Sequence, residues 1–455
     1  MSWRVAGILF ALGVLTRIPF QTDYVWAHDS VLYARAIERF DPLDQRPQAP
    51  GYLYYVLLIR AMYTLVGDPN RAMTIVSLVA GAAAVALLYL FAARLYDERT
   101  ARASGAFMLT AVTFWTYGGV AYPYTLLAAL SIGCAMLFWR VLRAESGRGW
   151  HMLLATAAYG IAIGFRTDLA VFLAPLWLMA AWTTPLLWAI GSAALGALLV
   201  LVWFFASAAA DGGVSTLLEA MRVQGKFVDE RYSLFGDLGL RALYGNTYEL
   251  GRFLGRGLTF LAPLLAAVPL SASARRIEVS DRRRIAFVLL WTLTPLAIYV
   301  PIHVGEYGYI FSMLPGLCVI AARGAVALAR GARMPRSLPW IVADAALAMP
   351  GCSSSAIRRS PRATSCVTTA ASASASSGSI SRTWPGRPCS PRTTRSSSST
   401  TSPMTSASPP ITCSSATTHR FPGARWSSAR VSATRAATCA ATASRFSPCG
   451  MTSSE

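Results

Sequence analysis

The chain has 455 residues, of which 54% are hydrophobic and only 14% are charged, and its formal net charge is +20. A soluble globular domain typically has about 25% charged residues. Apolar runs close to the ~20 residues of a bilayer crossing recur from residue 3 to residue 328. One soluble core of this size could not bury so many long runs. The composition therefore predicts an all-α, polytopic membrane protein.

The positive charge is unevenly distributed along the sequence. Residues 351–455 hold twelve Arg and one acid, Glu455. Most of the remaining basic residues lie in short loops between apolar runs, where they indicate membrane orientation. No folded region shows a basic patch interleaved with aromatic residues. We therefore expect the lipid bilayer, and not nucleic acid, as a partner.

We expect about ten transmembrane helices, with further helices lying on the outer membrane surface. The first run has an Arg near each end and no small-residue cleavage site, so it is interpreted as a retained span. The candidate spans are residues 3–20, 73–93, 103–120, 122–139, 152–166, 168–183, 186–207, 253–271, 286–302 and 306–328.

The apolar stretch at residues 52–66 fixes the orientation of everything after it. If it lies on the membrane surface, the N-terminal Arg4 and all later basic clusters fall on one side, as the positive-inside rule requires. If it crosses, those later clusters move to the side opposite Arg4. Arg60 also argues against crossing, because an Arg at the centre of a span costs at least ~2.5 kcal/mol. We therefore expect a cytoplasmic N-terminus and a juxtamembrane helix at residues 52–66 on the outer face.

This topology brings polar segments that are distant in sequence to one outer face. Residues 208–252 read as one or two amphipathic helices, which either pack on the membrane surface or cover a site. Residues 21–55 are the richest in candidate acid and base groups. Outer loops are also simply where polar residues lie, so each single residue has this simpler interpretation. The outer segments are residues 21–72, 118–125, 166–168, 208–252 and 303–309.

The order of these segments resembles the GT-C superfamily of glycosyltransferases. Among them it is most similar to bacterial members related to protein O-mannosyltransferases and lipid A aminoarabinose transferases. The first loop is similar to that family's acidic loop, and the following Pro- and Tyr-rich stretch to the start of its juxtamembrane helix. The resemblance covers about residues 3 to 330. It rests on His28 to Ala34, Arg46 to Tyr55, Arg94 to Asp97, Gly160 to Asp168, and Glu306 to Pro315.

The resemblance implies transfer of a sugar from a polyprenyl-phosphate donor to an acceptor at the outer face. The acceptor is a lipid, a glycan or a protein. An inverting, one-step transfer needs a carboxylate that takes the acceptor proton, and we expect Asp29 to be this general base. Arginine suits the departing phosphate because its planar guanidinium matches phosphate oxygens. The expected substrate-binding residues are Arg46, Tyr52, Arg166, Asp168, His303 and Glu306.

The sequence departs from the family pattern at two points. Asp29 is followed by Ser30, where the family often has two adjacent acids. The second outer loop, Tyr117 to Tyr124, has no acid. Divalent cations such as Mg²⁺ and Ca²⁺ prefer several oxygen ligands. We therefore expect no metal and no other cofactor. The expected location is the bacterial cytoplasmic (inner) membrane.

Other interpretations of these residues remain open. Asp29 is also a good N-cap for a helix over Val31 to Phe40, and Arg166 with Asp168 could anchor a turn between spans. Tyr52 could belong to an interfacial aromatic belt. For the whole chain, the alternatives are a transporter or flippase, or an inactive truncated membrane protein. No clear internal repeat of the transporter kind is present.

The expected domain is a GT-C-like transmembrane domain at residues 1–337. Residues 338–350 look like the start of a further span that is interrupted. Residues 351–455 are rich in Ser, Thr, Ala, Arg and Pro, which predicts a disordered, low-complexity tail.

A frameshift would explain this tail. The chain has one Lys, Lys226, against forty Arg, as expected of a GC-rich gene, and such a gene translated in the wrong frame gives text of this composition. We hypothesise a frameshift near codon 350. Resequencing should reveal a downstream frame that encodes further apolar spans, and the absence of such a frame would refute the hypothesis.

Overall fold

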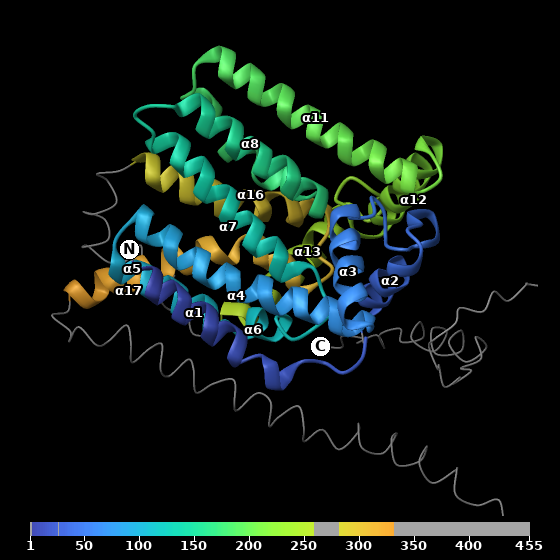
Figure 1. Cartoon of the computed structure of the whole chain (residues 1–455), viewed down its shortest axis with the longest axis horizontal. Coiled ribbons are helices and arrows are strands. Elements are labelled where there is room, and N and C mark those ends of the chain that lie inside the picture. Colours follow the sequence, from blue (N-terminus) through green and yellow to red (C-terminus); the bar gives the residue numbers. More distant parts are fainter. Residues whose placement is uncertain (1, 26, 259–281, 332–455) are drawn as a thin grey trace, which may run out of the picture. The chain divides into compact units, whose positions relative to one another are not determined.

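A computed structural model describes residues 2–25, 27–258 and 282–331 (Figure 1). The described part is helical and contains no β-strand, which confirms the predicted all-α class. The segments at 338–350 and 351–455, and most of the expected span 253–271, lie outside these residues. The elements are α1 (Trp3–Leu15), η1 (Ile18–Phe20), α2 (His28–Glu38), η2 (Pro42–Asp44), α3 (Leu53–Val66), α4 (Pro69–Leu95), α5 (Glu98–Thr110), α6 (Val112–Tyr117), α7 (Tyr124–Arg143), α8 (Arg148–Phe165), α9 (Leu169–Phe172), α10 (Ala174–Trp182), α11 (Leu186–Ala210), α12 (Val214–Tyr232), α13 (Leu240–Leu258), α16 (Arg282–Ile302), η3 (Tyr307–Ser312) and α17 (Leu314–Gly331).

Several helices are long and apolar enough to cross a membrane. In the described part of the chain there are five: α1 extended through η1, α4, α7, α11 and α16. The expected span 152–166 corresponds to the continuous helix α8, and 253–271 lies mostly outside the described residues. Helix α3 and the first part of α17 are shorter apolar helices. The chain is thus a multi-pass membrane protein, as predicted. We expected about ten continuous spans. Among the described residues, some of the helices are long and continuous, and others are broken.

Two expected spans are broken helices. The span predicted at 103–120 forms α5 and α6, which separate at Ala111, where the backbone is extended (ψ 112°). The span predicted at 168–183 forms α9 and α10, which separate at Leu173, shortly before Pro175. A Pro has no backbone N–H, so it fits the first turn of a helix without loss of a hydrogen bond. Pro175 accordingly lies in the first turn of α10, which begins at Ala174.

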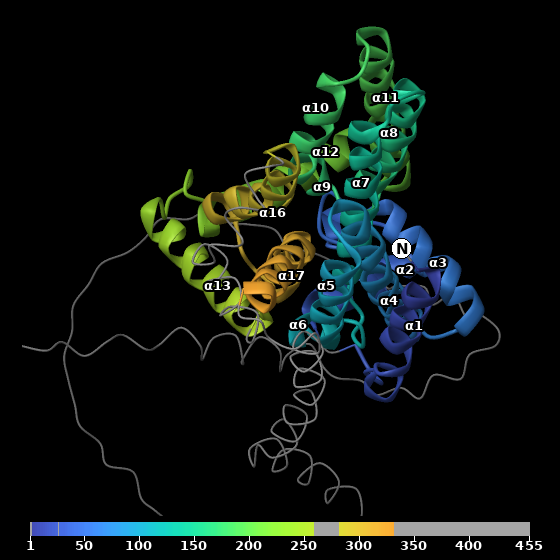
Figure 2. The ribbon, with the colours of Figure 1, turned by 90° about the vertical axis from the view of Figure 1, so that its left-hand side faces the viewer.

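Helix α4 is the centre of the packing and contacts α1, α5 and α7 along its length (Figures 1 and 2). Its 27 residues are preceded by Asp68, whose carboxylate accepts a hydrogen bond from the Arg71 N–H at 2.8 Å. Asp97 caps the next helix in the same way, accepting from the Thr100 N–H at 2.8 Å. An acidic N-cap satisfies one of the free N–H groups of a helix start. These two caps fix where α4 begins and where the chain turns into α5.

Helices α2 and α3 form a surface unit beside the start of α4. The guanidinium of Arg60, in the middle of α3, donates to the backbone oxygens of Ile37 and Ala36 at 2.9 and 2.8 Å. These carbonyls belong to the last turn of α2, where a helix has unpaired acceptors and a negative dipole end. Arg60 therefore joins α3 to the end of α2. At 14 residues, or about 21 Å, α3 is also shorter than a crossing, which supports the surface placement predicted for residues 52–66.

Helix α11 packs along α8 and otherwise presents apolar side chains outward, among them Leu187, which is 83% exposed. Such a face is suited to contact with lipid. The close approach to α8 depends on a glycine. A Cβ at Gly160 would lie 2.7 Å from Leu199 Cδ1 and 2.8 Å from its Cβ. A small residue is thus needed where these two helices meet.

Replacement of Gly160 should therefore loosen the pairing of α8 with α11. We expect Gly160→Leu to lower the stability by about 1–3 kcal/mol, because overpacking forces the helices apart, as measured by thermal unfolding in detergent. Gly191→Leu in α11 is the matched control, since a Cβ there meets nothing within 4 Å. An equal loss for both variants would contradict this account of the interface.

Candidate active site

The most deeply buried charge of the outer segments, that of Arg166, forms an ion pair at the end of α8. Arg166 is 4% exposed, and its Nη2 lies 2.6 Å from Asp168 Oδ2. Its Nε also donates to Asp168 Oδ1 at 3.3 Å. Two residues that are two positions apart can meet here because α8 ends at Phe165 and the backbone of Arg166 is extended. A bidentate pair of this kind holds the guanidinium in one orientation.

Aromatic rings enclose this pair on several sides. The guanidinium carbon of Arg166 lies 5.0 Å from the ring centre of Tyr52 and 4.9 Å from that of Tyr124. Tyr52 starts α3 with a left-handed backbone (φ +49°), and Tyr124 starts α7. The Tyr299 hydroxyl donates to Asp168 Oδ2 at 3.4 Å. The ends of four helices, α3, α7, α8 and α16, are thus brought together around one charged pair.

Asp29 lies in the first turn of α2 and faces the same group of residues. The N-cap of α2 is Ala27, and no side chain caps this helix end, so Asp29 does not have the capping role considered above. Its Oδ1 instead accepts a hydrogen bond from Gln48 Nε2 at 3.2 Å. Burial raises the pKa of Asp29, while His28, Arg166 and the Gln48 hydrogen bond oppose this rise. The carboxylate is half-buried.

Glu306 supplies a second carboxylate from the segment between α16 and η3. Its oxygens accept hydrogen bonds from the hydroxyls of Tyr117, at 3.1 Å, and Tyr122, at 3.4 Å. Burial raises the pKa of Glu306, and the charge of Asp29 raises it further. The second outer loop has no acid, but two of its tyrosines thus donate hydrogen bonds to an acid from a distant segment.

The structure therefore brings together five of the seven predicted site residues. Direct contacts link Arg166 with Asp168 and Tyr52. The charge of Arg166 lowers the pKa of Asp29, and the charge of Asp29 raises the pKa of Glu306. We call the set Asp29, Tyr52, Arg166, Asp168 and Glu306 the outer cluster.

His303 lies near the outer cluster, but its surroundings are aromatic. Its ring centre is 4.3 Å from that of Tyr232 and 5.8 Å from that of Tyr309. Burial lowers the pKa of His303 to about 4. The imidazole is therefore neutral at pH 7, and any contact with a phosphate would be a hydrogen bond to a neutral ring. Its buried Nδ1 has no hydrogen-bond partner within the described residues.

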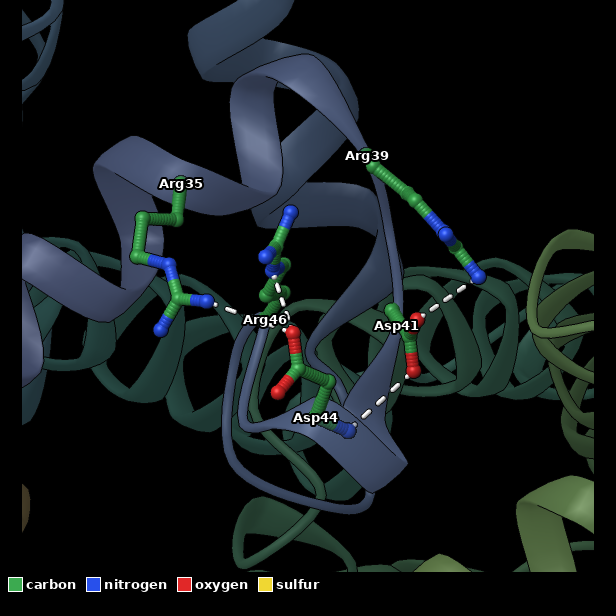
Figure 3. A network of polar contacts seen from close by, with 5 residues as sticks. All are labelled: Arg35, Arg39, Asp41, Asp44 and Arg46. Carbon is green, nitrogen blue, oxygen red and sulfur yellow. Dashed lines mark hydrogen bonds and ion pairs between the residues drawn. The ribbon is translucent and has the colours of Figure 1, made fainter. Parts of the chain in front are cut away.

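Arg46 belongs to a separate polar network (Figure 3). Its Nε lies 2.7 Å from Asp44 Oδ2, and Arg35 Nη2 lies 3.2 Å from the same oxygen. Arg39 pairs with Asp41 at 2.9 Å. These ion pairs order the loop between α2 and α3, which also carries Gln48. Arg46 thus contacts the loop and not the outer cluster, and it acts on the cluster only by ordering the loop that carries Gln48.

Several members of the site were not named from the sequence. Gln48 is the most important of them, since it contacts Asp29 directly. The tyrosines around Arg166 and Glu306 form a continuous aromatic wall, in which the rings of Tyr299 and Tyr309 stack at 4.9 Å. The spacing Tyr117, Tyr122 and Tyr124 in a short outer loop was the available signal. Among the described residues, no group of three or more His, Cys, Asp or Glu side chains is arranged to hold a metal ion.

Comparison with known proteins supports the same class of molecule. Residues 48–208 match the family described as dolichyl-phosphate-mannose-protein mannosyltransferase. No curated protein matches the chain.

Among solved structures, ArnT from Cupriavidus metallidurans bound to undecaprenyl phosphate is 15% identical, with a TM-score of 0.50 over 72% of this chain and 59% of that one. The apo form of that ArnT is 16% identical, with a TM-score of 0.47 over 72% and 58% of the two chains. The Archaeoglobus fulgidus oligosaccharyltransferase in complex with Zn and sulfate is 15% identical, with a TM-score of 0.44 over 75% and 52%.

The chain thus spans somewhat more than half of the ArnT structure, 59% of its length, and shares its fold. The match over residues 48–208 includes Gln48, Tyr52, Arg166 and Asp168. The resemblance found in the sequence is confirmed: residues 48–208 match a mannosyltransferase family, and the fold is similar to that of ArnT, a GT-C-type membrane glycosyltransferase.

Proposed function

We propose that this protein transfers a sugar from a polyprenyl-phosphate donor to an acceptor at the outer face of the membrane. The observation that carries the proposal is the outer cluster. It places a half-buried carboxylate, Asp29, in one site with a fixed guanidinium, Arg166. The ArnT structure with a similar fold was solved with undecaprenyl phosphate, which supports a donor of this chemical class.

In the proposed reaction Asp29 acts as the general base. The acceptor oxygen or nitrogen attacks the anomeric carbon of the sugar, and its proton passes to the carboxylate. The bond between that carbon and the phosphate oxygen breaks, and the lipid phosphate leaves with the electron pair. Asp29 suits this role because Gln48 occupies Oδ1, which leaves Oδ2 for the proton. The reaction is a one-step, inverting displacement that needs no metal or other cofactor.

Arg166 is proposed to stabilise the departing phosphate. Its Nε and Nη2 donate to Asp168, so Nη1 remains for a phosphate oxygen. The pair keeps the guanidinium in place before the substrate arrives, which is the basis of electrostatic preorganisation. Tyr52 and Tyr124 flank the guanidinium and would bound the donor on both sides. Glu306 and the neutral His303 would contribute hydrogen bonds to sugar hydroxyls.

A cavity at the loop between α2 and α3 is the space that we propose for the acceptor. Its volume is about 740 Å³, and its wall includes Ala49 and Pro50, which directly follow Gln48 in the chain. The opposite wall is formed by α12, with Lys226 and Asp229, and by Phe235. Helix α12 therefore borders this space, from which we propose that an acceptor approaches Asp29 past the loop that carries Gln48. The chemistry of that acceptor stays open between a lipid, a glycan and a protein.

The proposed setting is the cytoplasmic membrane of a bacterium, with the N-terminus inside. The charge distribution supports this orientation. Arg94 follows the apolar run of α4, and Arg140 and Arg143 end α7, whereas Tyr124 and the outer cluster lie at the other end of α7. By the positive-inside rule the basic end faces the cytoplasm.

Loss of the base should abolish most of the transfer. In isolated membranes supplied with radiolabelled polyprenyl-phosphate sugars, we expect Asp29→Asn to lower the rate by about 10²- to 10⁴-fold, as for removal of a general base. Asp23→Asn is the matched control, because Asp23 is an exposed acid of the same outer loop. Equal transfer by wild type and Asp29→Asn would refute the assignment of Asp29, and no transfer by wild type with any donor would refute the proposed function.

The pH dependence provides a separate test of the contact between Gln48 and Asp29. The Gln48 hydrogen bond lowers the pKa of Asp29, so Gln48→Leu should raise it. Because a general base works in its ionised form, the acidic limb of the pH–rate profile should move to higher pH in this variant. The profile is measured from about pH 5 to about pH 9. Arg35→Gln, which alters the neighbouring ion-pair network only, should leave the limb in place; an unshifted limb in Gln48→Leu would contradict the contact's role.

A further inference from the structure

A second site lies at the other end of the helices that carry the outer cluster. A cavity of about 530 Å³ opens between the last turns of α4 and α7. Its lining combines three arginines with an apolar floor that includes a buried tryptophan, Trp139. The lining residues are Arg94, Met136, Leu137, Trp139, Arg140 and Arg143. We call this the basic cavity.

The position of the basic cavity follows from the length of α7. This helix begins at Tyr124, beside Arg166, and ends at Arg143, so that it contains 20 residues. At 1.5 Å per residue it is about 30 Å long, which equals the hydrocarbon thickness of a typical bilayer. The basic cavity and the outer cluster thus lie at opposite membrane interfaces.

Tryptophans mark the same interface on neighbouring helices. Trp150 lies in the first turn of α8, and Trp182 ends α10. Both line a separate cavity with Arg148, and both are largely exposed, at 66% and 92%. Tryptophan is enriched where a membrane meets water. The basic cavity therefore lies at the depth of lipid headgroups.

Among the described residues, no carboxylate neutralises the charges of the basic cavity. None of its lining residues is acidic. Within the described part of the chain, no ion pair joins a carboxylate to Arg94, Arg140 or Arg143. All three side chains are exposed. Arg94 Nη1 also lies 2.7 Å from Met136 Sδ, so this arginine from α4 reaches across to α7. The three guanidinium groups thus lie around one cavity and keep N–H donors that are available to a ligand.

The spacing of the lining residues places the charges and the apolar surface together. Met136, Arg140 and Arg143 follow one another at intervals of four and three, so they share one face of α7. Leu137 and Trp139 give the cavity its apolar floor. A ligand that fits must therefore combine a negative group with a hydrocarbon part. A phosphodiester suits the planar forks of several arginines, and acyl chains suit the apolar floor.

We propose that the basic cavity binds the headgroup of an anionic phospholipid of the inner leaflet. The phosphodiester lies among the three guanidiniums, and the first part of the acyl chains lies along Leu137 and Met136. A general attraction of basic residues to a negative membrane surface is delocalised and needs no cavity. The proposed site differs from it in depending on these three arginines and not on their neighbours.

The test measures lipid binding to the purified full chain in detergent. A fluorescent phosphatidylglycerol is titrated in mixed micelles, with the phosphatidylcholine analogue as the neutral comparison. We expect wild type to prefer phosphatidylglycerol, and the triple variant Arg94→Gln/Arg140→Gln/Arg143→Gln to bind it about tenfold or more weakly. Thermal unfolding checks that the variant is folded. If the triple variant does not fold, Arg140→Gln alone should still weaken binding measurably.

The matched control removes the same charge from the same side of the membrane. Arg99, Arg282 and Arg283 are exposed and do not line the basic cavity, so Arg99→Gln/Arg282→Gln/Arg283→Gln should bind the lipid nearly as well as wild type. An equal loss in both triple variants would overturn the proposal in favour of delocalised attraction. Competition by inorganic phosphate as strong as by the lipid would overturn it in favour of a free-phosphate site.

Discussion

The structure depends on how one charge, that of Arg166, is held away from water. A buried guanidinium without a partner is costly, and the cost falls only when its hydrogen bonds and its charge are met locally. Asp168 provides both, and Tyr52 and Tyr124 close the remaining sides. Each of these partners begins or ends a helix. The contacts that the buried guanidinium requires therefore fix where α3, α7 and α8 meet. Asp29 lies next to this junction.

The division of roles between the two carboxylates also follows from their partners. Both oxygens of Glu306 accept hydrogen bonds from tyrosine hydroxyls, which hold the group in place. Asp29 has one oxygen bound by Gln48 and one that is not used by that bond. Under the proposed function, Asp29 is the group that can take a proton, whereas Glu306 shapes the pocket. The hydrogen bonds from the tyrosines to Glu306 thus leave Asp29 as the acid that is available for proton transfer.

Much of the fold was predictable because membrane insertion leaves strong signals. Apolar length was enough to predict the helical class. The basic loops and the cost of Arg60 in a span predict that residues 52–66 lie on the membrane surface, on the same side as the other polar segments. The breaks at Ala111 and Leu173 were not predictable, because an apolar run with the same composition can be continuous or interrupted. In the site, Arg166, Asp168, Asp29 and Glu306 were found by charge.

Gln48 was missed because an uncharged amide in a Pro-rich loop carries no such signal. Arg46 was overvalued because the sequence does not show that its partner is Asp44 in its own loop. Ionisable groups are scarce in a membrane protein and therefore stand out in its sequence. The neutral neighbours that orient them do not stand out, since those contacts depend on tertiary packing.

The short separation of Arg166 and Asp168 has a consequence for how the protein is made. A membrane protein is synthesised from its N-terminus, and its helices enter the bilayer in sequence. Because the two partners are only two residues apart, they can neutralise each other as soon as α8 has entered, before α16 exists. Glu306 is synthesised much later and is the acid that raises the negative charge near Asp29. The order of synthesis therefore introduces the attractive pair first and the repulsive pair last, when the surrounding helices are already in place to hold it.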